Sequence, residues 1–203
     1  MERKDNYAIQ AKLAQARFLT YDQQKIIDKF HLAHDEAYLY PVMLGSRYRL
    51  DRHSGNFQRE VDGNWVDANS FGEVLTLLDI LCDAKDLRYL TGRWKAIHHF
   101  GHMFHQSLAE DSKHFLAEAF DRDEAALRRA CDALGARPIP GGDFGCAIEL
   151  FDGLSIGILF WHGDEEFAPR LRYYWDDNAL QYIRYETMYY AMGLLETRLK
   201  ELL

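Results

Sequence analysis

The sequence predicts an α+β protein with a mixed or mainly antiparallel sheet of about five or six strands, covered by N-terminal helices and a long C-terminal helix. Apolar residues recur every three or four positions near both ends of the chain, as in amphipathic helices. Elsewhere, short apolar and aromatic runs are separated by Asp-Gly and similar turn pairs, as in antiparallel hairpins. The length of 203 residues suits a single domain, 1–203, which we expect to comprise a helical hairpin at 1–35 and an α+β body at 36–203.

The predicted helical hairpin begins with a helix at 6–18, where apolar residues such as Tyr7, Ala11 and Phe18 lie three or four positions apart. Thr20 and Gln23 fit a capping box, which predicts that a second helix begins there.

A β-hairpin is predicted around Gly45-Ser46, between the apolar runs 42–44 and 48–50. Glycine at the first central position of a two-residue loop favours a type II′ turn. Turn residues at 54–56 and 62–64 then enclose a short strand that contains Phe57.

The middle of the chain is mainly helical. Ser70 and Glu73 form a second capping box in front of an apolar stripe, and Gly135 is a typical helix terminator. We expect helices at about 71–84, 112–120 and 123–134, and a short strand or irregular cover at 87–97.

The last third of the chain predicts three strands and one long helix. Asp152-Gly153 joins runs 144–151 and 154–161, which favours a type I′ hairpin. The run 154–161 is apolar on both faces, so it is expected at the centre of the sheet. A strand at 171–175 follows, and Asp176 or Asp177 is expected to cap a helix at 178–201.

The charge balance argues against a nucleic-acid partner. The chain has 24 Lys and Arg against 32 Asp and Glu, a formal net charge of −8, and an acidic surface repels phosphate backbones. The sequence contains no apolar run long enough to span a bilayer, and its first residues are polar, so we expect no membrane contact and a cytoplasmic location.

Cysteine chemistry is not expected to organise the fold. Cys82, Cys131 and Cys146 are far apart and form no Cys-x-x-Cys pair. This pattern predicts neither a disulfide framework nor an iron–sulfur or zinc site built by this chain alone. The sequence also lacks the common phosphate-loop, dinucleotide, nucleophile-elbow and His-Glu-x-x-His motifs.

The strongest functional candidate is an acidic loop after the run 154–161. It carries three consecutive carboxylates, and a further acidic residue follows one short strand later. In an extended segment Asp164 and Glu166 point to the same side, where carboxylates repel each other or share a cation. Mg²⁺ or Ca²⁺ would suit such oxygen ligands. The candidate ligand-binding residues are His162, Asp164, Glu165, Glu166 and Asp176.

Two other interpretations of this loop stay open. A carboxylate and His162 could act as an acid–base pair of an enzyme. Alternatively, Asp164 and Glu165 accept hydrogen bonds from backbone N–H groups of a tight turn after Gly163, and Asp176 only caps the helix that follows.

A cluster of histidines at 98–105 is a second candidate metal site. On a helix, His98, His102 and His105 would share one face, and such a face can bind zinc, nickel or copper. Gly101 disfavours a helix here, and the alternative is a polar loop near a cleft.

The order of several segments resembles a known family. The hairpin sequence at 44–50 is followed by a segment with Trp94, then by Gly-Asp-Glu-Glu-Phe at 163–167, and then by Asp176-x-x-Ala179-x-x-Tyr182. This order, over residues 37–195, is similar to that of uncharacterised bacterial and archaeal proteins catalogued as a domain of unknown function. The acidic loop is the most specific part of the resemblance.

The resemblance implies an accessory role and assigns no catalytic residue. Members of that family occur in anaerobes, and some lie beside iron–sulfur domains or beside corrinoid and one-carbon genes. The resemblance therefore implies a ligand- or partner-binding module of one-carbon or corrinoid metabolism, with an iron–sulfur or corrinoid protein as partner. A structural protein that dimerises through the aromatic residues of 173–190 is the remaining alternative.

Overall fold

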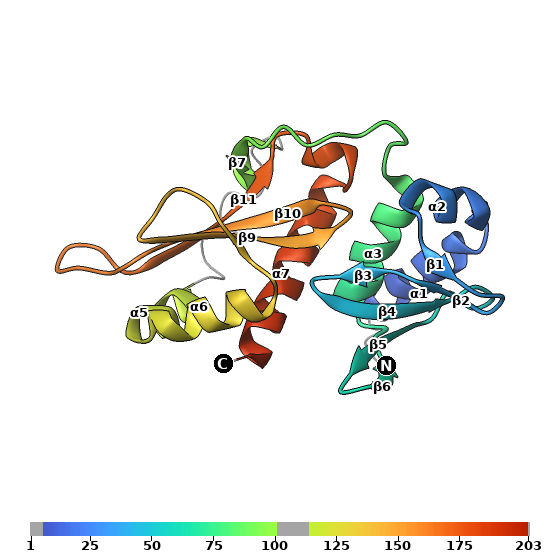
Figure 1. The fold of residues 1–203 in the computed structure, drawn as a ribbon, viewed down its shortest axis with the longest axis horizontal. Coiled ribbons are helices and arrows are strands. Elements are labelled where there is room, and N and C mark those ends of the chain that lie inside the picture. Colours follow the sequence, from blue (N-terminus) through green and yellow to red (C-terminus); the bar gives the residue numbers. More distant parts are fainter. Residues whose placement is uncertain (1–5, 101–113, 203) are drawn as a thin grey trace. The chain divides into compact units, whose positions relative to one another are not determined.

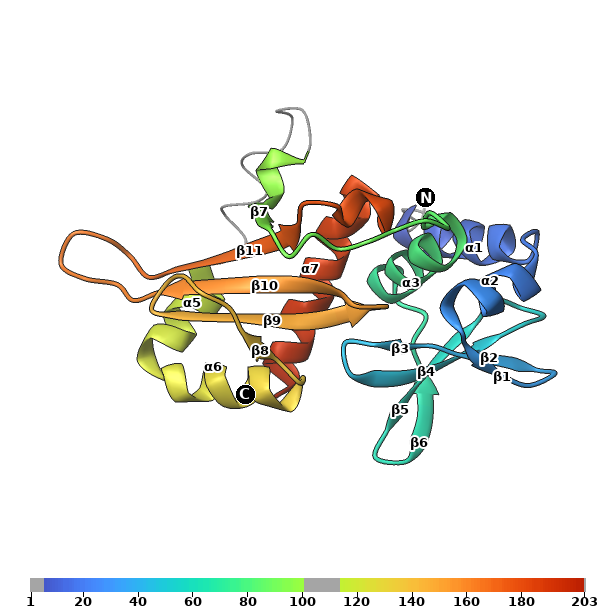
Figure 2. The same ribbon diagram turned by 45° about the horizontal axis from the view of Figure 1, so that its top comes forward.

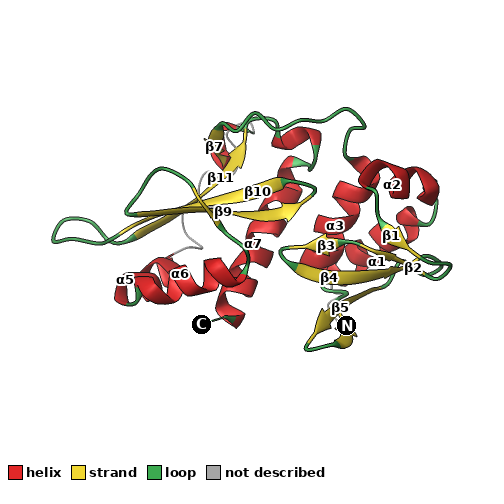
Figure 3. Cartoon of the chain, viewed as in Figure 1, coloured by secondary structure: helices red, strands yellow, loops and turns green. Residues whose placement is uncertain are grey.

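The computed structural model describes residues 6–100 and 114–202 of the chain. It divides into two compact units, Met1–Arg88 with Gln181–Ala191, and Tyr89–Leu180 with Met192–Leu203. Each unit combines helices with antiparallel strands, which confirms the α+β class (Figures 1 and 3). The strands form two separate sheets. The expectation that residues 1–203 form a single domain stays a prediction.

Unit 1 contains the first sheet, the helices that precede and follow it, and the first turns of the C-terminal helix. Its strands pair in the order β1-β2-β4-β5-β6, and β3 pairs with β4. The helices are α1 (Asn6–Phe18), α2 (Gln23–Phe30) and α3 (Phe71–Asp83), and the strands are β1 (Ala33–His34), β2 (Tyr38–Tyr40), β3 (Val42–Met43), β4 (Ser46–Asp51), β5 (Phe57–Val61) and β6 (Asn64–Asp67).

The core of unit 1 lies between one face of this sheet and the packed helices α1 and α3. Alternate residues of β4 and its neighbours, including Leu39, Tyr48, Leu50 and Phe57, are buried on that face. The opposite face is aromatic and cationic, and the Arg49 guanidinium lies 4.7 Å from the Tyr38 ring and 4.8 Å from the Trp65 ring.

Two local predictions in unit 1 are wrong. The residue that caps α2 is Asp22 and not Thr20. The Asp22 carboxylate accepts hydrogen bonds from the backbone N–H groups of Gln24 and Lys25, in the first turn of the helix. The hairpin turn between β3 and β4 is Leu44-Gly45, with φ angles of 48° and 70°. Positive φ at both central residues defines a type I′ turn, where type II′ was expected.

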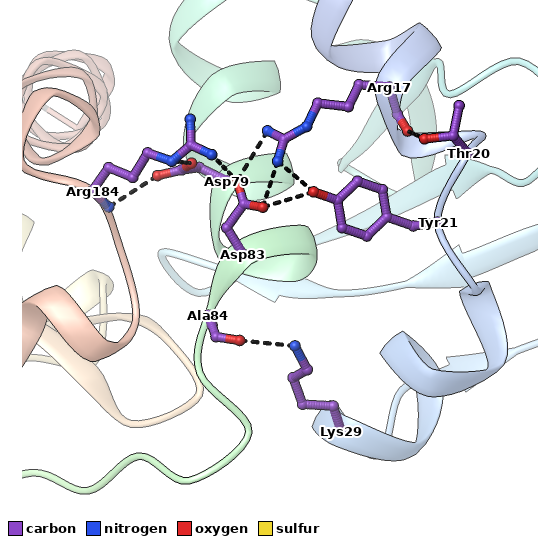
Figure 4. A network of polar contacts seen from close by, with 8 residues as sticks. All are labelled: Arg17, Thr20, Tyr21, Lys29, Asp79, Asp83, Ala84 and Arg184. Carbon is purple, nitrogen blue, oxygen red and sulfur yellow. Dashed lines mark hydrogen bonds and ion pairs between the residues drawn. The ribbon is translucent and has the colours of Figure 1, made fainter.

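A polar network joins the elements of unit 1 around Asp83, at the end of α3 (Figure 4). Arg17 donates to both carboxylate oxygens of Asp83 at 3.0 and 2.6 Å, and the Tyr21 hydroxyl donates at 2.7 Å. Arg184 donates at 2.5 Å and also lies 3.0 Å from the buried Asp79 carboxylate. One carboxylate therefore links α1, the α1–α2 loop and the start of the C-terminal helix.

Unit 2 contains the second sheet, with strand order β7-β11-β10-β9-β8. The predicted central strand is confirmed, because β10 lies in the middle and pairs with β9 and β11. The elements are β7 (Trp94–Ala96), the 3₁₀ turn Ile97–His99, α5 (His114–Arg122), α6 (Glu124–Ala133), β8 (Arg137–Pro138), β9 (Phe144–Phe151), β10 (Leu154–Trp161), β11 (Arg170–Asp176) and the 3₁₀ turn Ala179–Gln181.

One face of the second sheet is the core of unit 2. Side chains such as Ile156, Phe160 and Trp175 are fully buried there, and the other face carries the alternate residues of each strand. Helices α5 and α6 lie on the buried side (Figures 1 and 2).

The C-terminal helix begins later than predicted. The helix α7 spans Tyr185–Glu201, and only a short 3₁₀ turn occupies part of the region before it. Asp176 does not cap a helix at 178, because its carboxylate accepts hydrogen bonds from the backbone of Thr91, Gly92 and Asn178. Within residues 6–100 and 114–202, no helix combines the length and apolar character needed to cross a membrane.

Candidate functional site

The acidic loop forms the tip of the β10–β11 hairpin, the orange loop that projects beyond the other elements of unit 2 (Figures 1 and 2). The two strands pair up to Trp161 and Arg170, so the loop comprises residues 162–169. The predicted loop thus lies on a rigid antiparallel ladder at the end of the central strand.

Asp164 holds the turn of this loop. Its Oδ1 accepts hydrogen bonds from the backbone N–H of Glu166 at 2.8 Å and of Phe167 at 2.7 Å. Its own N–H donates to the carbonyl oxygen of Phe167 at 2.9 Å. This is the aspartate turn that the sequence offered as an alternative to ligand binding.

His162 anchors the loop to the helices beneath it. The ring Nδ1 lies 2.8 Å from Oδ1 of Asp121 at the end of α5, and Nε2 lies 2.6 Å from Oε2 of Glu124 at the start of α6. Because carboxylates only accept, both ring nitrogens must donate, and the geometry fits a doubly protonated imidazolium. With both nitrogens engaged, His162 has none left for a substrate in this arrangement.

We call the contact of His162 with Asp121 and Glu124 the His162 clamp. Its charges favour the ionised forms of all three side chains. The hydrogen bond to Asp121, followed by that to Glu124, raises the pKa of His162 above its ordinary value. The same contacts lower the pKa of both carboxyls. Arg128 adds a second cation to Glu124, at 2.6 Å from its Nε to Oε1. The loop is therefore held by ion pairs as well as by backbone hydrogen bonds.

Two backbone contacts fix the path of the loop. The His162 N–H donates to Oδ2 of Asp143 at 2.8 Å, and the Gly163 N–H donates to Oδ1 of Asp121 at 3.1 Å. A Cβ on Gly163 would lie 2.8 Å from Cδ of Pro169, closer than side-chain atoms approach. Only glycine therefore allows the two ends of the loop to come this close.

The outer side of the tip is left for contacts with other molecules. Glu165 and Glu166 are exposed, and the Phe167 side chain is 61% exposed. Together with Asp121, residues 163–169 line a shallow hollow of about 540 Å³. We name Glu165, Glu166 and Phe167 the acidic tip.

Asp176 does not join this site. It lies at the opposite end of β11 from the loop, and a strand of seven residues spans about 20 Å. Its carboxylate is buried and is used by backbone N–H groups of residues 91, 92 and 178. Of the five predicted residues, the structure brings together His162, Asp164, Glu165 and Glu166.

The two predicted metal sites stay predictions, and the histidine site falls largely outside the part of the chain that the structure describes. Within that part, no group of three His, Cys, Asp or Glu side chains is close enough to hold a metal ion. Asp164 and Glu166 share a turn, in which the Asp164 carboxylate binds the Glu166 N–H. Of the histidine cluster, His98 lies in a 3₁₀ turn, and His102 and His105 lie outside the described residues.

The aromatic residues of 173–190 do not form an exposed face. Every tyrosine and tryptophan in this range is buried or half-buried. None of them is fully exposed, and dimerisation through this segment stays a prediction.

The sequence did not reveal the carboxylates that hold His162. Asp121 and Glu124 are 41 and 38 positions away from it, and Asp143 is 19 positions away. The only local signal was the charged run at the boundary between the two predicted helices, at 121–124.

Fold and site together define an α+β protein in which a clamped β-hairpin presents acidic and aromatic side chains. The chain belongs to the family described as a domain of unknown function, DUF3786, which it matches over residues 22–198. The resemblance to a family of unknown function is thereby confirmed, over a longer range than the 37–195 expected. No curated protein and no solved structure is similar enough to match the chain.

Proposed function

We propose that the protein is a binding module whose acidic tip docks onto a partner protein. The observation that carries this proposal is that different side chains of the loop hold its shape and face solvent. The side chains of Asp164 and His162 are engaged in holding its shape, whereas the side chains of Glu165, Glu166 and Phe167 are exposed.

The rigidity of the tip favours binding. A loop that is ordered before association loses less conformational entropy when a partner binds. The Asp164 turn, the His162 clamp and the close approach of Gly163 to Pro169 all order this loop in the free protein.

The chemistry of the tip indicates the surface that it recognises. Two adjacent carboxylates attract a basic patch and speed the encounter, and an exposed phenylalanine fills an apolar pocket once the partners touch. The partner is thus a protein with an apolar depression bordered by Lys or Arg. Following the family resemblance, we propose an iron–sulfur or corrinoid protein of one-carbon metabolism.

Site-specific photo-crosslinking tests the proposal. A photoreactive phenylalanine replaces Phe167 in the full chain, expressed in its native cells, and illumination is expected to join it to one defined protein. The same group at Leu180, which is 45% exposed and also in unit 2, is the matched control and is expected to give no such product.

The identity of the captured protein and the effect of charge complete the test. The double variant Glu165→Gln/Glu166→Gln should abolish the crosslink at 167. A variant with the same loss of charge on α5 and α6, Glu118→Gln/Asp132→Asn, should retain it. Diffuse products at both positions, or a crosslink indifferent to Glu165 and Glu166, would contradict docking through the tip.

A further inference from the structure

A second hollow lies in unit 2, on the face of the sheet opposite α5 and α6. It is an open hollow with a volume of about 640 Å³, and small-molecule sites typically have about 300–1,000 Å³. It is lined by Trp94, Lys95, Ala96, His98, His99, Arg172 and Tyr174. None of them belongs to the acidic tip or to the clamp around His162.

Small residues on three of four neighbouring strands leave room for an aromatic ring against this face. The register aligns Ala96, Tyr174, Gly157 and Ala147 across four neighbouring strands. A Cβ on Gly157 would lie 3.0 Å from Cε3 of Trp94, so the indole lies directly over this glycine. Trp94 and Ile139 therefore cover Gly157, the Arg137 guanidinium lies 5.8 Å from the Trp94 ring, and Tyr174 supplies the neighbouring aromatic surface.

Arg172 supplies a positive charge that the described residues do not neutralise. It is half-buried on β11, and no hydrogen bond or ion pair of its guanidinium occurs within residues 6–100 and 114–202. Removing a guanidinium from water without a partner is costly, so such a group usually has a counter-ion. By contrast, Arg93 nearby lies 2.7 Å from the Asp177 carboxylate.

The carboxylates on the same face are already engaged. Asp176 binds the backbone N–H of Thr91 and Gly92, and Glu149 binds the N–H of Gly153 at 2.9 Å. Neither is free to pair with Arg172. The charge of the hollow is consequently positive in an otherwise acidic protein.

We propose that this hollow binds a small molecule in which a planar aromatic ring carries a carboxylate or phosphate group. The ring stacks on Tyr174, and the anionic group pairs with Arg172, whose planar fork matches the two oxygens of such a group. His99 also lines the hollow, and its imidazole can donate a further hydrogen bond.

Calorimetric titration of the full chain with matched probes tests both halves of this proposal. Adenosine monophosphate and nicotinate carry ring and charge, adenosine and nicotinamide carry the ring alone, and inorganic phosphate carries the charge alone. At least one of the charged rings is expected to bind saturably. The probes that lack either feature are expected to bind about tenfold more weakly or worse. Which charged ring binds distinguishes phosphate from carboxylate recognition.

Arg170 provides a matched control, because it lies on the same strand and face, is exposed and does not line the hollow. Arg172→Gln should weaken binding about tenfold or more, and Arg170→Gln by less than about twofold. The Tyr174→Phe variant should bind the charged ring with the affinity of the wild type, whereas the Tyr174→Leu variant should bind it more weakly.

Three outcomes would overturn the proposal. The first is that neither charged ring binds saturably at millimolar concentration, and the second is that the Arg172→Gln variant binds as tightly as the wild type. The third is that both arginine variants lose the same affinity, which would indicate general electrostatic attraction. Circular dichroism of each variant verifies that it is folded, so that a loss of affinity refers to the hollow.

Discussion

Nε2 of His162 lies 2.6 Å from Oε2 of Glu124, which joins the acidic loop to the first residue of α6. A second carboxylate, that of Asp121, holds the other ring nitrogen at 2.8 Å. The contact is exposed, so its effect is local order of the loop more than global stability.

The clamp predicts how the order of the loop depends on pH. The pKa of His162 is raised, so its contribution is complete below the ordinary histidine pKa of 6.5 and is lost as the pH rises through the raised value. The pKa values of Asp121 and Glu124 are lowered, so their contributions are lost as the pH falls through the lowered values. The loop should be most ordered between about pH 4.5 and 6.5.

Nuclear magnetic resonance titration of the His162 ring measures this directly. We expect a pKa above 6.5 in the wild type and a lower value in the Glu124→Gln variant, which keeps the shape but removes a charge. A wild-type pKa at or below 6.5 would show that the clamp does not hold a charged imidazole in solution.

Gly163→Ala should distort the acidic loop. The new Cβ would lie 2.8 Å from Cδ and 3.0 Å from N of Pro169, so the loop must open. We expect a cost of about 1–3 kcal/mol and altered amide resonances of Glu166 and Phe167, which report on the Asp164 turn. Unchanged amide shifts at both residues would be incompatible with the close approach described for Gly163.

Asp176→Ala should destabilise unit 2 without altering the acidic tip. The substitution leaves the buried N–H groups of residues 91, 92 and 178 without their acceptor, at a cost of about 3 kcal/mol in urea-induced unfolding. Asp177→Ala, which removes only surface ion pairs, should cost less. An equal effect of both substitutions would argue against the role assigned to Asp176.

Asp83→Asn should weaken unit 1 by about 2 kcal/mol, because the carboxylate accepts hydrogen bonds from three side chains (Figure 4). Burial acts to raise its pKa, but hydrogen bonds from Arg17 and Tyr21 prevail, and the pKa is lowered. The contribution of Asp83 is thus present at neutral pH and lost as the pH falls through the lowered pKa. Asp28→Asn, on the exposed face of α2, is the control, and a similar loss there would refute the network.

Short-range sequence signals predicted much of the fold. The Ser70 hydroxyl caps α3 as expected, and Asp152 and Gly153 have the positive φ angles of 52° and 79° that a type I′ turn requires. In these places the interacting groups are neighbours in the sequence, so the local pattern determines the structure.

The sequence signals gave wrong predictions where segments far apart in the chain bind the same side chain. Asp176 precedes the terminal helix region, as a cap would, but its carboxylate is used by residues 91 and 92, which lie 85 and 84 positions away. The carboxylates that hold His162 are likewise remote. Consequently the acidic loop could be found in the sequence, but its division into a holding part and an exposed part could not.

The affinity of the crosslinked partner for the isolated wild-type chain tests the docking proposal most directly. Relative to wild type, Glu165→Gln/Glu166→Gln should weaken binding about tenfold and make it less sensitive to salt, and Glu118→Gln/Asp132→Asn should change it by less than about twofold. Equal affinities of wild type and the tip variant, with the same dependence on salt, would contradict the assignment of the acidic tip as the docking surface.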